Sequence, residues 1–199
     1  MIHPHHDINT RKNRQRALAK SRRQTAAADQ NGASRDAAEV FFRSVVPASR
    51  AVIAGYWPHQ TELDCRPLLA RACESGRTCV LPVVDSASQH LIFRQWRPGD
   101  ILKTGRYDVL EPADDAATFR PDVVIVPLLA FDRRGYRLGY GAGFYDKTLS
   151  YLRRQGTVLA VGYAFAVQEV ENVPHDQYDE PLDWIVTPAE AVRRGTGKI

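Results

Sequence analysis

The sequence predicts an α/β fold of three layers (α/β/α), in which helices cover both faces of a mostly parallel central sheet. Short apolar runs rich in β-branched residues alternate along the chain with segments rich in helix formers. These runs are almost continuously apolar, as expected for strands that are buried on both faces. A chain of 199 residues can bury one substantial core. Because no repeat or linker interrupts it, we expect residues 1–199 to form a single domain.

The first elements are expected to be two helices and a strand. Residues 11–28 contain neither glycine nor proline and favour a helix that Asn9 or Thr10 caps. Residues 1–10 are then expected to be a flexible tail. A second helix is predicted to begin at a Ser34 cap and to end before a proline. The first strand is predicted at residues 51–56.

The remaining chain continues the alternation of strands and helices. A helix between the first two strands predicts a βαβ unit, and glycines are expected to end both later helices. One long segment carries only turn signals and is expected to be an irregular connection. Helices are predicted at residues 64–74 and 144–154. Strands are predicted at residues 78–84, 89–96, 122–126, 157–163 and 182–186, of which 182–186 is expected to be the last. The irregular connection is residues 98–121.

Charge is concentrated at the N-terminus. The formal net charge is +4, and residues 1–28 contain seven of the 27 lysines and arginines against one acidic residue, so the remainder is near neutral. A basic segment of this kind favours an anionic partner, which can be a nucleic acid, a membrane surface or a phosphorylated small molecule. No apolar run approaches the ~20 residues of a membrane helix, and no apolar secretory signal follows the N-terminal charges. We therefore expect a cytoplasmic protein, and its three cysteines, which lack metal-site spacing, should be reduced thiols.

A glycine-rich segment follows the most continuously β-branched strand. In parallel sheets ligands bind beyond the carboxyl ends of the strands, so this segment is the first place to look for function. Gly139, Gly141 and Gly143 occupy alternate positions directly before a predicted helix, where backbone N–H groups and the helix dipole favour an anion. Arg137 adds a planar set of donors, and Asp146 in the first helical turn offers an oxygen ligand for a hard cation. The pattern predicts a phosphate site.

Other nucleotide motifs fit this segment poorly. No G-K-[ST] follows the glycines, which excludes a Walker A loop. Twelve residues separate the first glycine from its strand, and residues 163–168 contain no carboxylate to hold a ribose, so a dinucleotide fingerprint is also disfavoured. A tight turn without a ligand stays open as an alternative.

Specific residues carry a resemblance to a known family. The run from Arg137 to Asp146 reads Arg-Leu-Gly-Tyr-Gly-Ala-Gly-Phe-Tyr-Asp, and Leu-Ala-Phe-Asp stands at residues 129–132. Both segments closely resemble the signature of the 5-formyltetrahydrofolate cyclo-ligase family, also called methenyltetrahydrofolate synthetases. The resemblance spans residues 12–187, and residues 11–187 would form the catalytic domain. It also includes Lys12-Asn-Arg-Gln-Arg16, Arg22, residues 56–65, Glu111-Pro112 and Asp179-Glu-Pro-Leu-Asp183-Trp-Ile.

The resemblance implies an ATP- and magnesium-dependent ring closure of 5-formyltetrahydrofolate to 5,10-methenyltetrahydrofolate, with release of ADP and phosphate. A formamide oxygen is a poor leaving group, so its phosphorylation would create an iminophosphate that the neighbouring amine can attack. Such a reaction needs cations and aligned amides around the transferred phosphoryl group and little covalent chemistry from the protein.

Roles follow for residues on the nucleotide side. Lys12 and Arg16 would bind ATP phosphate, and Arg16 would also face the folate. Arg137 would stabilise the charge that develops during transfer. Asp146 and Asp179 would hold Mg²⁺ directly or through water, because that ion usually takes one or two carboxylates beside substrate phosphates. The other ATP-binding residues would be Leu138, Gly139, Tyr140, Gly141, Ala142, Gly143, Phe144 and Tyr145.

The resemblance also implies a folate site. Glu62 would accept hydrogen bonds from the N–H donors of the pterin. Trp57, Tyr107 and Phe144 would form an apolar wall against its ring, with Tyr140 completing the site. Structural alternatives stay open, since Glu62 can cap a helix and aromatic residues can simply fill a core.

Two departures from the family and two other functions qualify this reading. Ala142 stands where many members have Lys or Gly, and Phe144 replaces a commoner Tyr, so a cation and a hydroxyl are missing.

A nucleic-acid-binding arm at residues 11–23 is one alternative, although no aromatic residues are interleaved with its charges. A sugar-phosphate isomerase or transferase on a similar sheet is another. We expect reduced folate and ATP as partners, without nucleic acid or membrane, and the oligomeric state stays open.

Overall fold

The computed structural model describes residues 4–28, 32–85 and 88–195. Its centre is a seven-stranded sheet in the order β11-β10-β9-β6-β1-β2-β3. The five inner strands are parallel, and β3 and β11 pair antiparallel at the two edges, which confirms a mostly parallel sheet. The strands are β1 (Val52–Ala54), β2 (Thr78–Val83), β3 (Ile92–Gln95), β6 (Val123–Pro127), β9 (Leu159–Tyr163), β10 (Trp184–Val186) and β11 (Ala191–Arg193).

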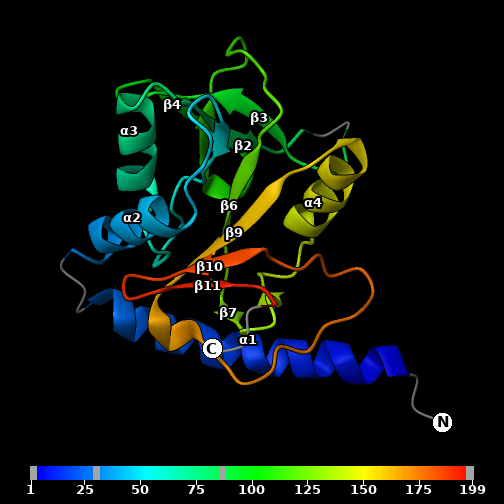
Figure 1. The fold of residues 1–199 in the computed structure, drawn as a ribbon. Coiled ribbons are helices and arrows are strands. Elements are labelled where there is room, and N and C mark those ends of the chain that lie inside the picture. Colours follow the sequence, from blue (N-terminus) through cyan, green and yellow to red (C-terminus); the bar gives the residue numbers. More distant parts are fainter. Residues whose placement is uncertain (1–3, 29–31, 86–87, 196–199) are drawn as a thin grey trace.

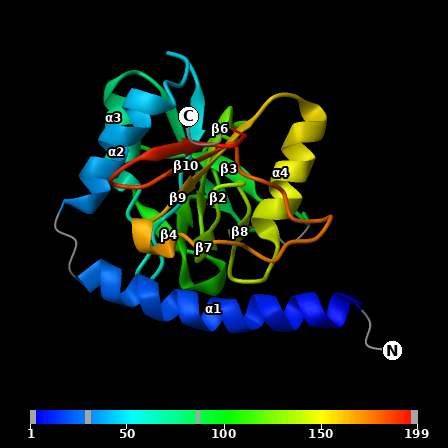
Figure 2. The same ribbon diagram turned by 60° about the horizontal axis from the view of Figure 1, so that its bottom comes forward.

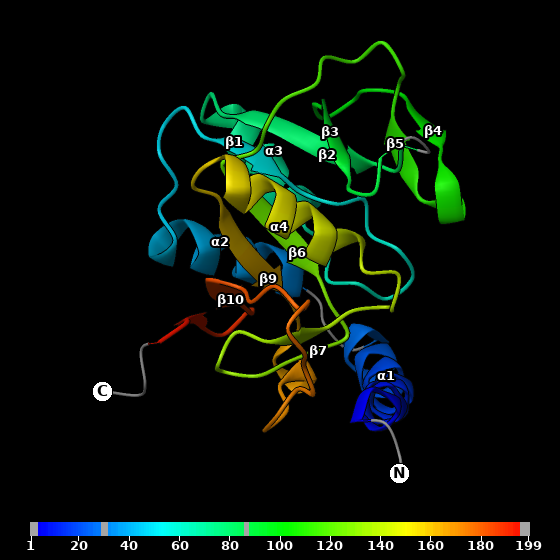
Figure 3. The same cartoon turned by 90° about the vertical axis from the view of Figure 1, so that its right-hand side faces the viewer.

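Helices cover both faces of this sheet, as the sequence predicts. Helices α2 (Ala33–Ser44) and α3 (Arg66–Glu74) lie on one face, and α4 (Phe144–Gln155) lies on the other (Figures 1 and 3). Alternate strand residues point to opposite sides, so Ile53 and Ile125 join the core under α2 and α3, whereas Ala54 and Val124 join the core under α4. This double burial explains why the strand sequences are continuously apolar.

The long helix α1 (Pro4–Ala28) runs across one end of the sheet (Figures 1 and 2). The predicted helix start at Arg11, with a cap at Asn9 or Thr10, is wrong, because residues 4–10 of the expected flexible tail 1–10 are helical. Pro4 is compatible with this start, because the first N–H groups of a helix have no partner within it. Residues 1–3 lie outside the described part.

The predicted Ser34 cap is also wrong. Helix α2 begins at Ala33, and its N-cap is Gly32 at φ +88°, without a side-chain capping bond. Glycine adopts this left-handed conformation readily, so the chain turns into the helix before Ser34 is reached.

Several short strands carry too little pattern to be predicted. The connection 98–121 contains a two-stranded sheet and a 3-10 turn, and a second small hairpin lies before the glycine loop. The chain also forms β11 after the strand predicted to be the last. Strands of two or three residues show no periodicity, so only their pairing partners define them. These elements are β4 (Leu102–Thr104), η1 (Arg106–Asp108), β5 (Leu110–Pro112), β7 (Ala130–Phe131), β8 (Arg137–Leu138) and η2 (Ala166–Gln168).

The three cysteines are free thiols, with Cys65 and Cys79 buried and Cys73 partly buried. Within the described ranges, no helix combines the length and apolar character that a bilayer crossing needs.

Candidate active site

A cavity of about 590 Å³ opens at the carboxyl ends of the inner strands. Pro127 at the end of β6, Trp57 after β1 and Val84 after β2 all line it. Ligand sites are expected at this edge of a parallel sheet. The cavity brings together every site residue predicted from the sequence, namely Lys12, Arg16, Trp57, Glu62, Tyr107, Asp179 and all of residues 137–146.

The glycine loop forms one wall and leads directly into α4. Gly141 has a φ of +110° and Gly143, the N-cap of α4, has a φ of +71°. Both values favour glycine over residues with a Cβ. No side chain caps this helix start, so its first backbone N–H groups are available to an anion. The loop therefore has the local geometry of a phosphate site.

Helix α1 lies over this loop, although more than a hundred residues separate them in the sequence. Arg16 Nε donates a hydrogen bond to the Gly139 carbonyl at 3.0 Å. A Cβ on Gly141 would lie 3.3 Å from Arg16 Cζ, so the guanidinium packs against the glycine backbone. The basic helix thus faces the loop rather than only the solvent.

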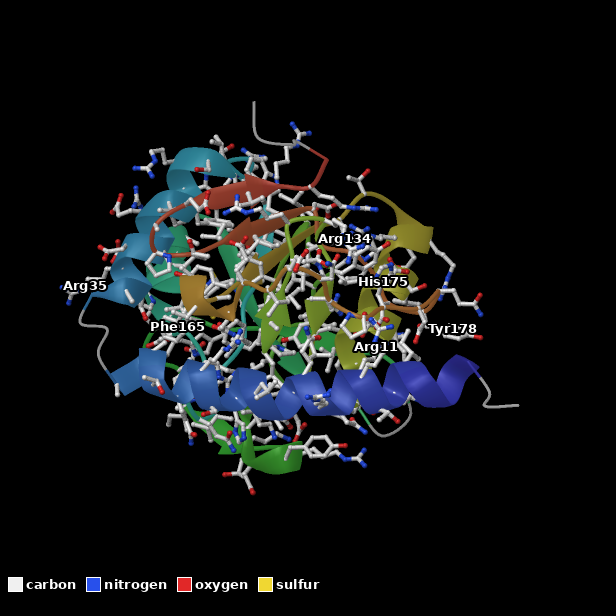
Figure 4. The ribbon with its side chains drawn as sticks, turned by 90° about the horizontal axis from the view of Figure 1, so that it is seen from below. Arg11, Arg35, Arg134, Phe165, His175 and Tyr178 are labelled. Atoms are coloured by element: carbon white, nitrogen blue, oxygen red, sulfur yellow. The ribbon has the colours of Figure 1, made fainter. Side chains whose placement is uncertain are left out.

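Lys12 joins α1 to the loop that precedes β10. Its ammonium donates to Asp179 at 2.6 Å and to Asp176 at 3.0 Å. Figure 4 shows this loop, marked by His175 and Tyr178, passing beside the part of α1 that carries Arg11. Burial lowers the pKa of Lys12, but the hydrogen bonds to the two carboxylates outweigh burial and raise the pKa above its ordinary value. Lys12 therefore stays charged, and in this structure it is paired with a predicted metal ligand.

Arg137 is held between two acceptors at the cavity wall. Its Nη2 donates to Asp146 Oδ1 at 2.7 Å, and its Nη1 donates to the Glu180 carbonyl at 2.5 Å. The Glu180 N–H also donates to Asp146 Oδ1 at 3.0 Å. Only 5 % of the Arg137 side chain is exposed, so its position is fixed before any ligand arrives.

Asp146 and Asp179 together fit a hard divalent cation. Burial raises the pKa of Asp146, and the charge of Asp179 raises it further, against the effect of Arg137. Each carboxylate keeps one oxygen that accepts no hydrogen bond from a described residue. No group of three or more acidic, His or Cys side chains suits a metal in the described ranges, so the pair fits an ion that completes its shell with phosphate and water oxygens.

Aromatic side chains and the buried Glu62 carboxylate line another part of the cavity. Phe144 and Tyr107 meet edge to face with ring centroids 6.0 Å apart, and Trp57 packs edge to face on Trp96. The Glu62 side chain is 5 % exposed and accepts a hydrogen bond from a backbone N–H. Burial raises the pKa of Glu62 above the usual glutamate value. Such a surface suits a flat ring that carries N–H donors at one edge.

Sequence reasoning missed other residues of the cavity. Arg106 and Glu111 line it from the connection 98–121. The family resemblance includes Glu111-Pro112 but assigned Glu111 no role, and Arg106 gave no signal. Arg23 lies beneath Glu62 and is 1 % exposed, whereas the motif comparison pointed to its exposed neighbour Arg22. Spacing on α1 offered a signal, because Arg23 follows Arg16 by seven residues and so shares its helix face.

Comparisons with known proteins agree with the fold and the motifs. The model of the 5-formyltetrahydrofolate cyclo-ligase family matches residues 7–188. The 5-formyltetrahydrofolate cyclo-ligase of Escherichia coli is 38% identical over 143 residues, which cover 69% of this chain and 78% of that protein. The protein of the same name from Mycolicibacterium smegmatis is 31% identical over 184 residues, or 88% of this chain and 92% of that protein.

A solved structure supports the architecture independently. The NMR structure of Aquifex aeolicus 5,10-methenyltetrahydrofolate synthetase superposes with a TM-score of 0.71 at 24% identity, covering 92% of this chain and 95% of that one. At this identity the likeness concerns the fold. Together with the family match over most of the sequence and the relatives above, it shows that the chain is an enzyme of the 5-formyltetrahydrofolate cyclo-ligase family.

Proposed function

We propose that this protein converts 5-formyltetrahydrofolate and ATP to 5,10-methenyltetrahydrofolate, ADP and phosphate, with Mg²⁺ bound beside the nucleotide. The observation that carries the proposal is the shared cavity, in which a glycine loop with basic side chains faces a buried carboxylate framed by aromatic rings. One half suits a polyphosphate and the other suits a pterin. Membership of the family supports the same reaction.

The proposed reaction begins with transfer of the γ-phosphoryl group of ATP to the formyl oxygen. The neighbouring amine then attacks the formyl carbon and loses its proton, and the oxygen leaves as phosphate. During transfer, negative charge is spread over the phosphoryl oxygens. Arg137 is fixed at the cavity wall, and the N–H groups at the start of α4 point to the same region, so both can stabilise that charge without rearranging.

Lys12, Arg16 and the two carboxylates complete the nucleotide half. Arg16 already lies on the glycine loop, at the border with the folate half, and would contact phosphate there. Asp146 and Asp179 would hold Mg²⁺, whose charge offsets that of the phosphates when the ion is bound. In this structure Lys12 forms an ion pair with Asp179, one of the two proposed metal ligands. Binding of the nucleotide would turn the Lys12 ammonium from the carboxylates towards phosphate.

Glu62 and the aromatic side chains would orient the folate. A charged carboxylate accepts hydrogen bonds from the pterin N–H groups more strongly than a neutral acceptor does. The rings of Phe144 and Tyr107 exclude water from one face of the substrate.

The structure does not favour the nucleic-acid alternative. Lys12 and Arg16 line the cavity and are engaged by carboxylates and a backbone carbonyl, and Arg23 is buried and donates to a hydroxyl. A surface that binds a phosphate backbone needs exposed cations, so a nucleic-acid arm would have to use Arg11, Arg14, Lys20 and Arg22 and would leave the three engaged cations without a role.

The direct test is to incubate the purified protein with 5-formyltetrahydrofolate, ATP and magnesium, and to follow the near-ultraviolet absorbance of the methenyl product. Release of phosphate is measured in parallel and should match the product in a one-to-one ratio. Omission of ATP, or of magnesium in the presence of a chelator, should abolish both signals. Ring closure at an undiminished rate without ATP would refute the proposed mechanism.

A further inference from the structure

Arg23 is a buried cation that none of the proposed roles uses. It lies on α1, and 2 % of its side chain is exposed. Its Nε donates to Thr61 Oγ1 at 3.1 Å. Its Nη1 is also buried, yet it has no hydrogen-bond partner among the described residues. An arginine does not lose its proton in a protein, so this buried charge needs a nearby anion.

The anion that faces Arg23 is Glu62. Arg23 Nη1 lies 3.9 Å from Glu62 Oε1, beyond hydrogen-bond distance but within range of strong charge attraction. The other oxygen, Oε2, accepts a hydrogen bond from the backbone N–H of His59 at 2.9 Å. Glu62 is therefore tied to its own loop on one side and faces the Arg23 charge on the other.

Several further groups surround this carboxylate, and their effects are unequal. Burial raises the pKa of Glu62, whereas the His59 N–H, the nearby Tyr140 hydroxyl and the Arg23 charge lower it. Among these groups Arg23 is the one with a permanent charge. The other titratable groups that interact with Glu62 are His59, Tyr56 and Cys65 beside it and Tyr145 on α4.

Arg23 itself is shielded from the cavity. It is absent from the cavity lining, and the Tyr140 ring centroid lies 5.4 Å from its Cζ. Arg23 can therefore act on a ligand only through the groups it contacts at the cavity wall, the Glu62 carboxylate and the Tyr140 ring. Arg23 also follows Lys12 and Arg16 on the same face of α1, so this helix lines the cavity with Lys12 and Arg16 and places Arg23 behind Glu62.

We propose that Arg23 is a positioning residue, which keeps the Glu62 carboxylate charged and directed at the folate half of the cavity. The inference rests on the proposed function, because it assumes that Glu62 receives N–H donors of a pterin. Without Arg23 the burial of Glu62 is less opposed, so the carboxyl group takes up its proton at a higher pH than in the wild type. Folate binding then weakens, while the nucleotide half is left as it is.

The test compares Arg23→Met with the matched control Arg22→Met, which removes an exposed arginine outside this cavity. Arg23→Met should raise the KM for the folate by up to about tenfold on the acidic side of the Glu62 titration, while the KM for ATP changes less than about twofold. The defect should shrink as the pH rises, because a more alkaline solution ionises Glu62 again. The control should behave as the wild type.

A double-mutant cycle with Glu62→Gln separates this role from a merely structural one. If Arg23 acts through Glu62, Arg23→Met should add little to the folate defect of Glu62→Gln. Carbon-13 NMR titration of the Glu62 carboxyl should show a pKa raised by roughly one pH unit in Arg23→Met. Additive defects, an equal loss of ATP affinity or an unchanged pKa would overturn the inference.

Two safeguards keep the outcomes distinct. If Arg23→Met does not fold, Arg23→Gln, which keeps a donor for Thr61 but loses the charge, takes its place, with thermal melting as the check on folding. Binding of 5-formyltetrahydrofolate to the wild type is measured first. Absent binding refutes the proposed function and the inference together, whereas normal wild-type binding with an unaffected Arg23 variant refutes the inference alone.

Discussion

Arg137 shows how single side chains of the site are held in advance of the reaction. Its guanidinium bridges Asp146 on α4 and the Glu180 carbonyl in the loop before β10, from a two-residue strand. A planar group with two parallel donors is well suited to this bridging, whereas an ammonium offers one point of charge. The protein thus places a fixed positive charge beside the glycine loop before any ligand binds.

Replacement of Arg137 should therefore impair chemistry more than folding. Arg137→Ala is expected to lower kcat by about a thousandfold, as for other arginines that stabilise phosphoryl transfer, and Arg137→Lys should restore little of it. Single-turnover product formation measures the effect. The control is Arg133→Ala. Arg133 lies in the turn of the same hairpin, between β7 and β8, and the change removes only its exposed ion pairs. An Arg137→Ala enzyme that keeps more than about a tenth of the wild-type kcat would place Arg137 outside the catalytic set.

Glu62 should make folate binding dependent on pH. Burial raises the pKa of Glu62 above that of an ordinary glutamate. As the pH falls through this raised pKa, the carboxylate is protonated and becomes a weaker hydrogen-bond acceptor. Equilibrium binding of 5-formyltetrahydrofolate without ATP should therefore weaken on acidification. Glu62→Gln should bind weakly throughout and lack this dependence, with the KM for ATP little changed. The same pH profile in the wild type and the variant would exclude Glu62 as its source.

At the scale of elements, the site depends on α1 crossing the glycine loop. The contact is close because Gly141 has no side chain and leaves room for the Arg16 guanidinium. Its positive φ adds a second reason for glycine at this position. Backbone conformation and contact with another element therefore restrict the same residue.

A double-mutant cycle between Gly141→Ala and Arg16→Ala tests this crossing. Gly141→Ala should strain the backbone and displace the guanidinium, which weakens ATP binding, and Arg16→Ala should relieve the steric part. The two penalties in ATP affinity should be non-additive by ~0.5–3 kcal/mol, measured by calorimetry. Gly99→Ala is the matched control, since Gly99 has a φ of +97° but no atoms near the added Cβ. It should lower stability without changing ATP affinity, and simple additivity of the first pair would argue against a shared site.

At the scale of the whole molecule, the cavity is closed by segments that lie far apart in the sequence. Helix α1 and the loop before β10 meet through Lys12 and through Gln15, which donates to the Asn172 carbonyl. The sheet supplies the floor, and α4 supplies the helix start. A ligand that contacts all these parts binds only the folded chain.

Magnesium ATP should accordingly stabilise the native state. At about a hundred times its Kd, a ligand adds about 2.7 kcal/mol, which corresponds to a rise in Tm of roughly 5–10 °C for a chain of this length. Differential scanning fluorimetry with ATP and magnesium measures the shift, and magnesium alone or a short DNA duplex at the same phosphate concentration serves as the control. A larger shift with the duplex would favour the nucleic-acid alternative.

Much of the architecture was predictable because long elements carry their own pattern. The β-branched run that became β6 and the glycine-flanked helix α4 agree with the prediction to within about two residues, a normal margin for such boundaries. The start of α1 and the cap of α2 were not predictable in this way. Local signals at Asn9 and Ser34 favour caps, but α1 is already helical from Pro4, and the left-handed Gly32 is the N-cap of α2.

Local composition and spacing predict the alternation of strands and helices and the glycine loop with its phosphate-binding residue types, and the family resemblance adds the residues for a pterin. The tertiary structure decided which of them meet. It paired Lys12 with Asp179, laid Arg16 on the glycine backbone and buried Arg23 rather than Arg22 behind Glu62. Such contacts join residues from distant segments, so they are set by how α1 and the loop before β10 pack on the sheet, which no local pattern encodes.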